Sequence, residues 1–411
     1  MRPTAATVTD IGSAGSGGRR GGSRRDVVAA LAVSTTVGYG VLYYAFSALL
    51  EPMSTDLGIS APTVTGALTL AVLVSAALSI PVGRWLDQHG GHVLMTAGSL
   101  LGAAAVLTWS QVQTAAELYG VFVAVGVASA MVLYQPAFAV IVAVTEAGKR
   151  TNALLGVTLV AGFASSIFIP LTGQLVHAFG WRGALIVLAV IVAVVTVPLH
   201  AVALRGTRPV ARRRLPTASP GRVLRDVGFW LVAFAFVLHG AALAIMAVHL
   251  VVFLTRLGHS ATAAATLAGL LGLLSVTGRV LTTVLRRWLP IAAVTAGIIA
   301  VQAVAIGMLP FIGQSVTGAA GCLVLFGLGF GVASIATPAI LLDRYGDQGY
   351  ATIAGILSTP TTIARATAPL GAALVAAAVG YRSLVLATAA TCLTAAAALA
   401  LTLRLGQPRN A

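Results

Sequence analysis

Residues 57–60 read LGIS, and residues 257–260 read the closely similar LGHS. The same displacement recurs twice more: Gly-Trp-Arg at 180–182 matches Gly-Tyr-Arg at 380–382, and IPLTGQLV at 169–176 resembles APLGAALV at 368–375. Three matches separated by about 200 residues indicate that one structural unit occurs twice in the chain. We therefore expect the fold to consist of two similar halves.

The composition identifies the environment of these halves as a lipid bilayer. Of 411 residues, 58% are hydrophobic and 9% are charged, and the mean hydropathy is +0.97. Ordinary globular domains carry about 25% charged residues. Continuous runs of Ala, Leu, Val and Gly recur at the length that a helix needs to cross about 30 Å of hydrocarbon. A barrel would need short alternating segments, so the sequence predicts an all-α integral membrane protein.

Twelve apolar runs are long enough to cross the membrane as helices, six in each half. They lie at 27–50, 62–82, 93–110, 115–142, 152–177, 181–203, 227–254, 261–281, 289–311, 316–342, 350–378 and 382–404. Six spans repeated in the same orientation predict two six-helix bundles related by a pseudo-two-fold axis along the membrane normal. Such bundles can open a central site to one side of the membrane and then to the other.

Polar segments divide the chain into five parts. These are a basic arm at 1–25, predicted to be disordered, a first bundle at 26–204, a linker at 205–226, a second bundle at 227–405 and a tail at 406–411. The arm, alternate loops and tail hold 21 of the 25 Lys and Arg residues. Because cytoplasmic loops retain basic residues, we expect a multi-pass protein of the cell (inner or plasma) membrane with both termini in the cytoplasm.

Other partners and sites are disfavoured by the same distribution. The arginines are scattered over loops without interleaved aromatic residues, so we expect no nucleic-acid partner. Cys322 and Cys392 fall inside predicted spans and offer neither a disulfide framework nor a metal cluster, and we expect no cofactor. SRRDVV at 23–28 loosely matches a twin-arginine export signal, but the basic loops that continue in phase behind it favour an anchor at the inner surface.

The loop between the second and third spans reads PVGRWLDQHGG at 81–91. In this loop and in its two six-span halves, the chain resembles the major facilitator superfamily from about residue 26 to 405. The family's loop reads Gly, three residues, Asp, a basic residue, any residue, Gly and further basic residues. The positions that fit are Gly83, Asp87 and Gly90, whereas Gln88, Gly91 and His92 stand where basic residues are usual.

The resemblance implies that this loop gates transport through Gly83, Arg84, Asp87 and Gly90. Gly83 allows two helices to approach closely, and Asp87 can face a helix N-terminus or the adjacent Arg84, holding one conformation shut. A tight polar turn without a conformational role is the alternative. The equivalent place in the second half has Gly278-Arg279, with Thr282 or Thr283 where an acid is expected.

Two signatures of the superfamily's drug/proton antiporters are missing. An arginine usual early in the fourth span is replaced here at about Phe122, and the fifth span reads GFASSIFIP at 162–170 without a Gly-Pro pair. Multidrug export by that mechanism is therefore disfavoured, and a drug or metabolite efflux carrier is kept as the alternative function.

Charges at membrane depth indicate the substrate class. The ten acidic residues all fall in loops, tails or span ends: Asp10, Asp26, Glu51, Asp56, Asp87, Glu117, Glu146, Asp226, Asp343 and Asp347. This pattern argues against organic cations and against an Asp/Glu proton relay. Arg365, in TTIARATAP at 361–369, lies fifteen residues into the eleventh span, about 22 Å from its inner edge. We expect it to be the only permanent charge at that depth.

An isolated guanidinium at that depth costs at least about 2.5–3.5 kcal/mol, so Arg365 should face a watery cavity or an anion. Its planar fork matches a carboxylate, which favours an anionic substrate. Bonds to backbone carbonyls freed near Pro360 and Pro369 are the alternative. The segment TIARATAP also resembles the eleventh span of oxalate/formate exchangers and monocarboxylate carriers, in which a cationic residue meets the carboxylate.

Residues on other central spans are candidates to share this site. Tyr39, Tyr43 and Phe46 recur at helical spacing in the first span, although helix packing is the commoner explanation of such a stripe. In the fourth span, Tyr134 and Gln135 precede Pro136, where a kink frees backbone groups. A histidine such as His239 in the seventh span is more often part of hydrogen-bonded packing, but it is the group near the midplane able to titrate at physiological pH. If transport is proton-linked, His239 or the substrate carboxyl would carry the proton.

We therefore predict a secondary transporter that moves a small organic anion, a mono- or dicarboxylate, by alternating access. No Gly-x-x-x-x-Gly-Lys-Ser/Thr loop indicates an ATP-driven pump, and the spans lack the paired acids or metal ligands of an intramembrane enzyme. A membrane-embedded sensor without transport is the remaining rival. We expect the carrier to act as a monomer.

Overall fold

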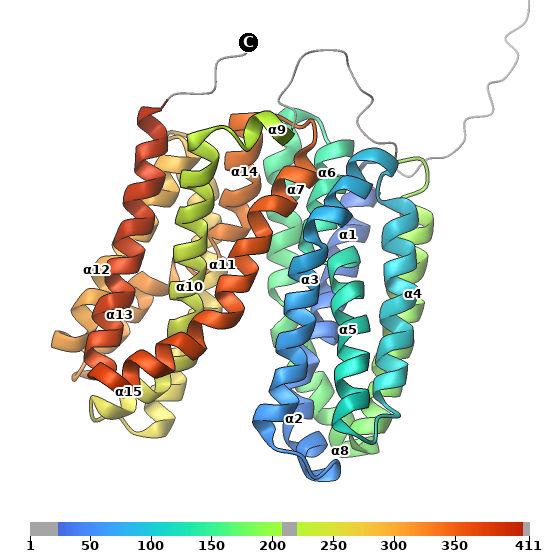
Figure 1. The fold of residues 1–411 in the computed structure, drawn as a ribbon, viewed down its shortest axis with the longest axis horizontal. Coiled ribbons are helices and arrows are strands. Elements are labelled where there is room, and N and C mark those ends of the chain that lie inside the picture. Colours follow the sequence, from blue (N-terminus) through green and yellow to red (C-terminus); the bar gives the residue numbers. More distant parts are fainter. Residues whose placement is uncertain (1–23, 208–219, 406–411) are drawn as a thin grey trace, which may run out of the picture.

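The computed structural model describes residues 24–207 and 220–405, and all regular structure within these ranges is helical (Figure 1). The predicted arm and tail and most of the predicted linker lie outside the described residues. The elements of the first half are α1 (Arg24–Tyr39), η1 (Gly40–Tyr44), α2 (Ala45–Asp56), α3 (Ala61–His89), α4 (His92–Trp109), α5 (Ala115–Val132), α6 (Tyr134–Val144), α7 (Ala147–Gly162), α8 (Ala164–Ile191), η2 (Val192–Thr196) and η3 (Leu199–Ala203).

The second half follows a short helix, α9 (Pro220–Val223). Its elements are α10 (Val227–Arg256), α11 (Ala261–Leu285), α12 (Ile291–Ile312), α13 (Val316–Gly327), α14 (Ala333–Tyr345) and α15 (Tyr350–Arg404). Figure 1 shows the two halves side by side, each a bundle of helices along a common direction. We call the end at which α1 begins and α15 ends the terminal end, and the opposite one the far end.

Nine helical runs of the described residues are long and apolar enough to cross a membrane. Two of them turn back on themselves, because Gly180 in α8 has φ 69° and Gly380 in α15 has φ 84°, a backbone conformation that favours glycine. The pair α13 and α14 adds one further pass. The twelve predicted spans and the fold of two six-helix bundles are thus confirmed.

Five spans depart from the continuous helices that the sequence predicts: the fifth is interrupted at Phe163, the sixth contains η2 and η3, and the first, fourth and tenth are the remaining ones. The first contains a π-helical turn, η1, between α1 and α2. The fourth breaks at Leu133, whose backbone is extended, three residues before Pro136, as the predicted kink requires. The tenth is interrupted between Gly327 and Ala333, where the glycine-rich GLGFG segment forms turns. Each break frees backbone groups inside the bundle.

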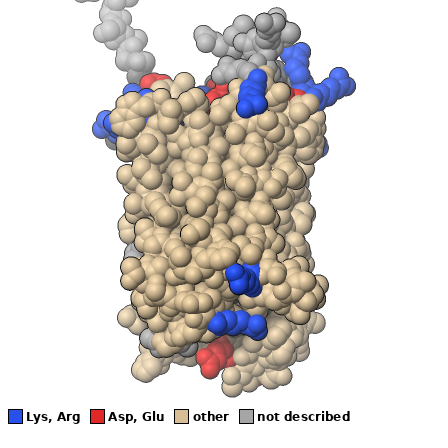
Figure 2. Space-filling view, turned by 90° about the vertical axis from the view of Figure 1, so that its left-hand side faces the viewer, with Lys and Arg blue, Asp and Glu red and all other residues tan. Residues whose placement is uncertain are grey.

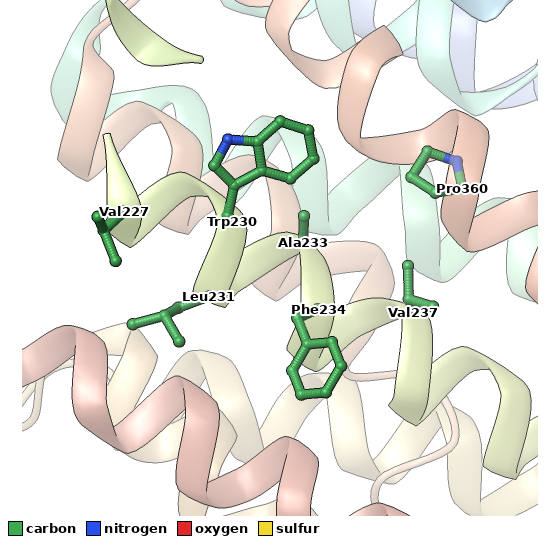
Figure 3. A pocket seen from close by; sticks show the side chains of 7 residues that line it. All are labelled: Val227, Trp230, Leu231, Ala233, Phe234, Val237 and Pro360. Atoms are coloured by element: carbon green, nitrogen blue, oxygen red, sulfur yellow. The ribbon is translucent and has the colours of Figure 1, made fainter. Parts of the chain in front are cut away.

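The surface is that of a membrane protein. Figure 2 shows basic side chains gathered at the terminal end, above a broad belt of uncharged residues, with few charges toward the far end. Large apolar side chains are exposed on many helices, as in Leu370 at 71% and Val194 at 67%. An apolar groove also runs beside α10 (Figure 3). The chain is a multi-pass membrane protein.

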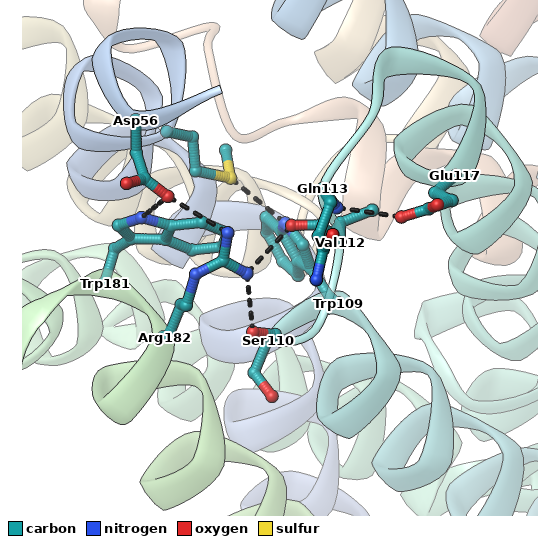
Figure 4. A network of polar contacts seen from close by, with 9 residues as sticks. Asp56, Trp109, Ser110, Val112, Gln113, Glu117, Trp181 and Arg182 are labelled. Atoms are coloured by element: carbon teal, nitrogen blue, oxygen red, sulfur yellow. Dashed lines mark hydrogen bonds and ion pairs between the residues drawn. The ribbon is translucent and has the colours of Figure 1, made fainter. Parts of the chain in front are cut away.

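At the far end, the repeated turn organises the first half. Arg182, just after Gly180, donates hydrogen bonds to the carbonyl oxygens of Ser110 and Val112 at 3.0 and 2.8 Å and pairs with Asp56 at 3.0 Å (Figure 4). Trp181 donates its indole N–H to the same carboxylate at 3.1 Å. These bonds tie the end of α2 to the α4–α5 loop and the turn inside α8.

The matching turn of the second half uses different contacts. Position 256, which corresponds to Asp56, is an arginine that stacks over Tyr381 at 4.4 Å, and Arg382 stacks over Phe311 at 5.0 Å. The repeat therefore preserves the turn, while its polar partners differ between halves.

At the terminal end, Asp226 connects α10 to α14. Its carboxylate caps α10 by accepting from Gly228 N at 3.0 Å, and it also accepts from Tyr345 Oη at 2.5 Å and Arg344 Nε at 3.2 Å. Burial alone would raise the pKa of Asp226, but these donors outweigh it and lower that pKa. The carboxylate therefore stabilises the fold above its ordinary pKa of 3.8, and that contribution is lost only as the pH falls through the lowered value.

We predict that Asp226→Ala lowers the free energy of unfolding by about 1.5–3 kcal/mol, because a charged acceptor and a helix cap are lost together. The apparent midpoint of thermal unfolding in detergent, measured for both proteins at pH 7 and pH 5, checks this. The deficit should be the same at both pH values. A deficit that disappears by pH 5 would show that the carboxyl titrates at or above its ordinary range.

Candidate functional site

A seam of small residues joins the two halves along α3 and α15. A Cβ placed on Gly83 would lie 2.4 Å from the carbonyl oxygen of Ala351, and one on Gly355 would lie 2.5 Å from that of Ser79. A turn further along α15, Thr359 donates its hydroxyl to the carbonyl of Ala76 at 3.0 Å. Any side chain larger than glycine at either contact would force the helices apart. Gly83 thus permits the close approach expected of it.

Asp87 closes this seam at the terminal end. Its carboxylate accepts from the backbone N–H groups of Ala351 and Thr352 at 3.1 and 2.8 Å and from the Thr352 hydroxyl at 2.6 Å. The first turn of α15 has no side-chain cap of its own half, so Asp87 supplies one from the opposite half. Of the two predicted partners, the structure has the helix N-terminus, whereas Arg84 is exposed. Gly90, with φ 77°, ends α3 just beyond.

Arginines make the corresponding contacts between α7 and the second half. Arg150 pairs with Asp347 at 2.7 Å, Arg279 donates to the carbonyl of Thr158 at 2.9 Å, and Arg286 bonds the hydroxyl of Thr151. The second-half loop lacks an acid equivalent to Asp87. Arg279 and Arg286 of that half instead donate hydrogen bonds to α7. Together with the Asp87 contacts, these bonds hold the halves together at the terminal end.

Arg365 lies where the two halves meet, beyond this closed end. Its aliphatic stem packs on Gly240 of α10, where an added Cβ would lie 3.0 Å from Arg365 Cγ. The side chain is exposed, and within residues 24–207 and 220–405 it has no hydrogen-bond or ion-pair partner. Tyr39 and Tyr44 of the first half lie within electrostatic range of its charge. The alternative of bonds to carbonyls near Pro360 and Pro369 is not what the structure has.

Three tyrosines of the first half, Tyr39, Tyr44 and Tyr134, form a cluster, and two of them lie within electrostatic range of this guanidinium. Tyr39 packs against Tyr134 with ring centroids 4.6 Å apart and lies 6.4 Å from Tyr44. The π-turn η1 adds a residue between Tyr39 and Tyr44, and it forms where Phe168 packs against Gly40, a position at which a Cβ would meet the ring at 2.2 Å. Such turns are frequent at functional sites.

The stripe predicted in the first span is divided by this turn. Phe46 is buried in the core of the first half against Phe122 and Trp109, at 5.6 and 6.3 Å between ring centroids. Tyr43 is 43% exposed and meets Tyr44 edge-on. Tyr44 does not belong to the predicted helical stripe, but in the structure it is the residue that lies near Tyr39 and Tyr134.

Arg279 is a second cation within a span, partly buried, which the sequence prediction missed. Its charge acts on Tyr44 and Tyr134, and its side chain packs on Gly162 and Gly331 in the middle of their spans. Arg279 Nε is buried without a hydrogen-bond partner among the described residues. Arg279 lies six residues before the end of α11, whereas Arg365 lies fifteen residues after the start of α15, so Arg279 is a second cation inside the bundle but nearer the terminal end. The eighth span runs four residues further than predicted, to Leu285, and carries Arg279 inward.

His239 and Gln135, two of the predicted substrate-binding residues, form hydrogen bonds to other side chains of the protein. His239 is fully buried, and its Nε2 lies 2.9 Å from Gln302 Oε1, while Gln302 Nε2 donates to the carbonyl of Phe326 at 2.7 Å, next to the break in the tenth span. Since Gln302 Oε1 can only accept, His239 carries its proton on Nε2, and Nδ1 has no partner among the described residues. Gln135 instead accepts from Ser358 across the seam at 3.2 Å.

Comparison with known proteins identifies the family. The sequence profile described as Major Facilitator Superfamily matches residues 31–369. No curated protein matches the chain.

Solved structures with similar folds are a human organic anion transporter, MFSD10 (TETRAN), a single-residue variant of the E. coli fucose:proton symporter FucP, and a bacterial homologue of the iron transporter ferroportin in its outward-facing state with soaked iron. MFSD10 has a TM-score of 0.72 at 15% identity, and the match covers 92% of this chain and 99% of its own. FucP has a TM-score of 0.71 at 14% identity, with 91% and 98% covered. The ferroportin homologue has a TM-score of 0.75 at 15% identity, with 92% and 98% covered.

The geometry of Asp87 predicts that Asp87→Ala opens the terminal end. The substitution removes the acceptor of three hydrogen bonds that join the halves, each worth about 1.5–3 kcal/mol to a charged group, so the closed population should fall by tenfold or more. Electron–electron distances between spin labels at the exposed positions Arg205 and Arg404 would report the change. Arg84→Ala, in the same loop, should leave the distances unchanged, and equal distances in wild type and Asp87→Ala would contradict the proposed gate.

Proposed function

This chain belongs to the Major Facilitator Superfamily, and we propose that it carries a small organic anion across the membrane by alternating access around Arg365. As a member of that family it is a transporter and not an enzyme. The cargo that we favour is a mono- or dicarboxylate. One of the similar folds belongs to a protein described as an organic anion transporter, which is compatible with this cargo.

The observation that carries the proposal is the unpaired guanidinium of Arg365 between two tyrosine-bearing spans. A charge at this depth needs water or a counterion, and no carboxylate of the described residues lies near the middle of a span. A bound carboxylate would satisfy the guanidinium through two parallel hydrogen bonds. In this proposal the hydroxyls of Tyr39 and Tyr134 would hold the same anion, with the partly exposed Tyr43 beside them.

Arg279 adds a second positive charge within electrostatic range of Tyr44. Its buried, unpartnered Nε supports a role in receiving the anion or its second carboxylate. Two cations and no acid give the site a net positive field, which attracts anions and repels organic cations. A drug or metabolite efflux carrier of neutral or cationic compounds is the alternative.

We propose that the two bundles rock about this site. The Gly83–Ala351 seam and the Asp87 cap hold the terminal end shut in the present conformation, so the site would open toward the far end. On the basic-residue distribution, the terminal end is the cytoplasmic face of the cell membrane, and the carrier acts as a monomer. The rocking would break the Asp87 and Arg150 contacts and form others at the far end.

A proton is the coupling ion that we propose, with His239 as its carrier. His239 Nδ1 is free to accept a proton, while Nε2–H is held by Gln302. Gly240, the next residue, touches Arg365, so a proton on His239 would add a third positive charge near the site. An anion at Arg365 and a proton at His239 would then stabilise each other by Coulomb attraction, which favours their joint movement.

The test of the proposed cargo is ligand binding by purified protein. Thermal unfolding would be followed against carboxylates, amino acids, sugars and drugs, since a ligand bound by the native fold raises the midpoint. We expect carboxylates to stabilise the wild type, Arg365→Ala to bind them at least tenfold more weakly and Arg365→Lys to keep part of the affinity.

Arg382→Ala, which removes an exposed arginine of α15 at the far end, should bind like the wild type. Full carboxylate stabilisation of Arg365→Ala would contradict anion binding at this residue. Stabilisation only by neutral or cationic drugs would support the efflux alternative.

The coupling prediction concerns His239→Gln in proteoliposomes. Wild-type uptake of a carboxylate found in the binding screen should rise when the outside is made more acidic, whereas His239→Gln should bind the carboxylate and lose the dependence on the gradient. His200→Gln, a histidine buried inside the first half, should keep it. If His239→Gln responds to the gradient as the wild type does, His239 does not carry the coupled proton.

A further inference from the structure

The groove beside α10 is open to the surface, since Val227, Trp230 and Phe234 along it are 64%, 52% and 49% exposed. It encloses about 460 Å³ and is lined by Val227, Trp230, Leu231, Ala233, Phe234, Val237 and Pro360. Figure 3 shows Pro360 of α15 across from the α10 side chains, and Figure 1 shows α10 between the two limbs of α15. All lining side chains are apolar apart from the indole N–H, so the groove favours a hydrocarbon occupant.

The length of the groove matches one leaflet. It follows α10 from Val227 to Val237, ten residues with a rise of about 15 Å. Half of a hydrocarbon core of about 30 Å has this depth. Since Val227 is the first residue of α10, the groove runs from the terminal end of the span toward the midplane. An acyl chain of that leaflet has the same direction and depth.

Aromatic side chains mark the mouth of the groove. Trp230 and Phe234, one helical turn apart, are 52% and 49% exposed. Trp230 Nε1 donates to the carbonyl of Leu224 at 2.9 Å, which fixes the indole with its polar edge toward the preceding loop. Tryptophan is typical of the headgroup level of a membrane, so a lipid seated here would have its headgroup beside this loop.

The loop at the mouth is basic. Arg222 and Arg225 are exposed in the segment that precedes α10. Asp226, the acid beside them, already accepts from Arg344, Tyr345 and Gly228, so its charge is compensated by partners of its own. A basic residue at a membrane surface attracts anionic lipid by about 1 kcal/mol. Cations above an apolar, leaflet-deep groove complement a negatively charged headgroup above its acyl chain.

We propose that this groove is a binding site for an anionic phospholipid, with one acyl chain along α10 and the phosphate group beside Arg225. The lipid would contact both helices that hold Arg365, because Pro360 precedes Arg365 by five residues on α15 and Val237 precedes Gly240 by three on α10. The site is independent of the transported solute and of the anion proposed above.

Trp230 is itself a reporter of the occupant. A variant that keeps only this tryptophan, with Phe at Trp85, Trp109, Trp181 and Trp288, would be placed in nanodiscs of phosphatidylcholine. Brominated phosphatidylglycerol or brominated phosphatidylcholine would then be added at equal low fractions to quench fluorescence. We expect several-fold stronger quenching by the anionic lipid, and loss of that preference in Arg225→Gln.

Two controls separate a built site from general attraction to basic loops. A variant that keeps only Trp288, which is 72% exposed next to Arg287 but outside the groove, should show little preference. Val237→Phe, which fills the lower groove and leaves the arginines, should reduce the preference at Trp230. If the fourfold substitution prevents folding, the difference in quenching between wild type and Trp230→Phe gives the same readout. Equal quenching by both lipids at Trp230, or equal preference at Trp230 and Trp288, would overturn the proposal.

Discussion

A guanidinium in the middle of a bilayer constrains everything around it. Placing one there costs at least about 2.5–3.5 kcal/mol unless water or a counterion compensates, and the described part of this chain supplies Arg365 with neither a carboxylate nor a main-chain oxygen. The protein surrounds it with tyrosines from the opposite half and positions its stem on Gly240. An anion from outside the protein completes this arrangement most simply, and the proposed cargo follows from that requirement.

The closed end depends on close backbone packing. Gly83 and Gly355 let α3 and α15 approach until backbone oxygens fill the places of side chains, and this proximity brings Asp87 onto the first turn of α15. The cap is a reversible contact, because the freed N–H groups of Ala351 and Thr352 can turn to water when the halves part. The repeat does not duplicate it, since the second half reaches α7 with Arg279 and Arg286. Two similar halves therefore meet through dissimilar chemistry.

Much of the fold was predictable, because long apolar runs and a repeated Gly-aromatic-Arg turn fix the spans and their reversal at Gly180 and Gly380. The site was predictable only in part. Arg365 is identified by its charge in an otherwise apolar run. Arg279 lies near the predicted end of its span, and only its packing against Gly162 and Gly331 shows that it is inside the bundle. The π-turn brings Tyr44, and not Tyr43, to the tyrosine cluster. It forms where Phe168 packs against Gly40, and a contact between residues so distant in the sequence cannot be predicted from a local pattern. The burial of His239 likewise depends on Gln302 in another span.

The most direct measurement is an experimental structure of the protein with a stabilising carboxylate bound. We expect density for the carboxylate within hydrogen-bond distance of the Arg365 guanidinium, beside the tyrosine cluster of Tyr39 and Tyr134 and in reach of Arg279. A guanidinium satisfied by main-chain oxygens, with the ligand bound away from it, would contradict the claim that this charge selects the cargo.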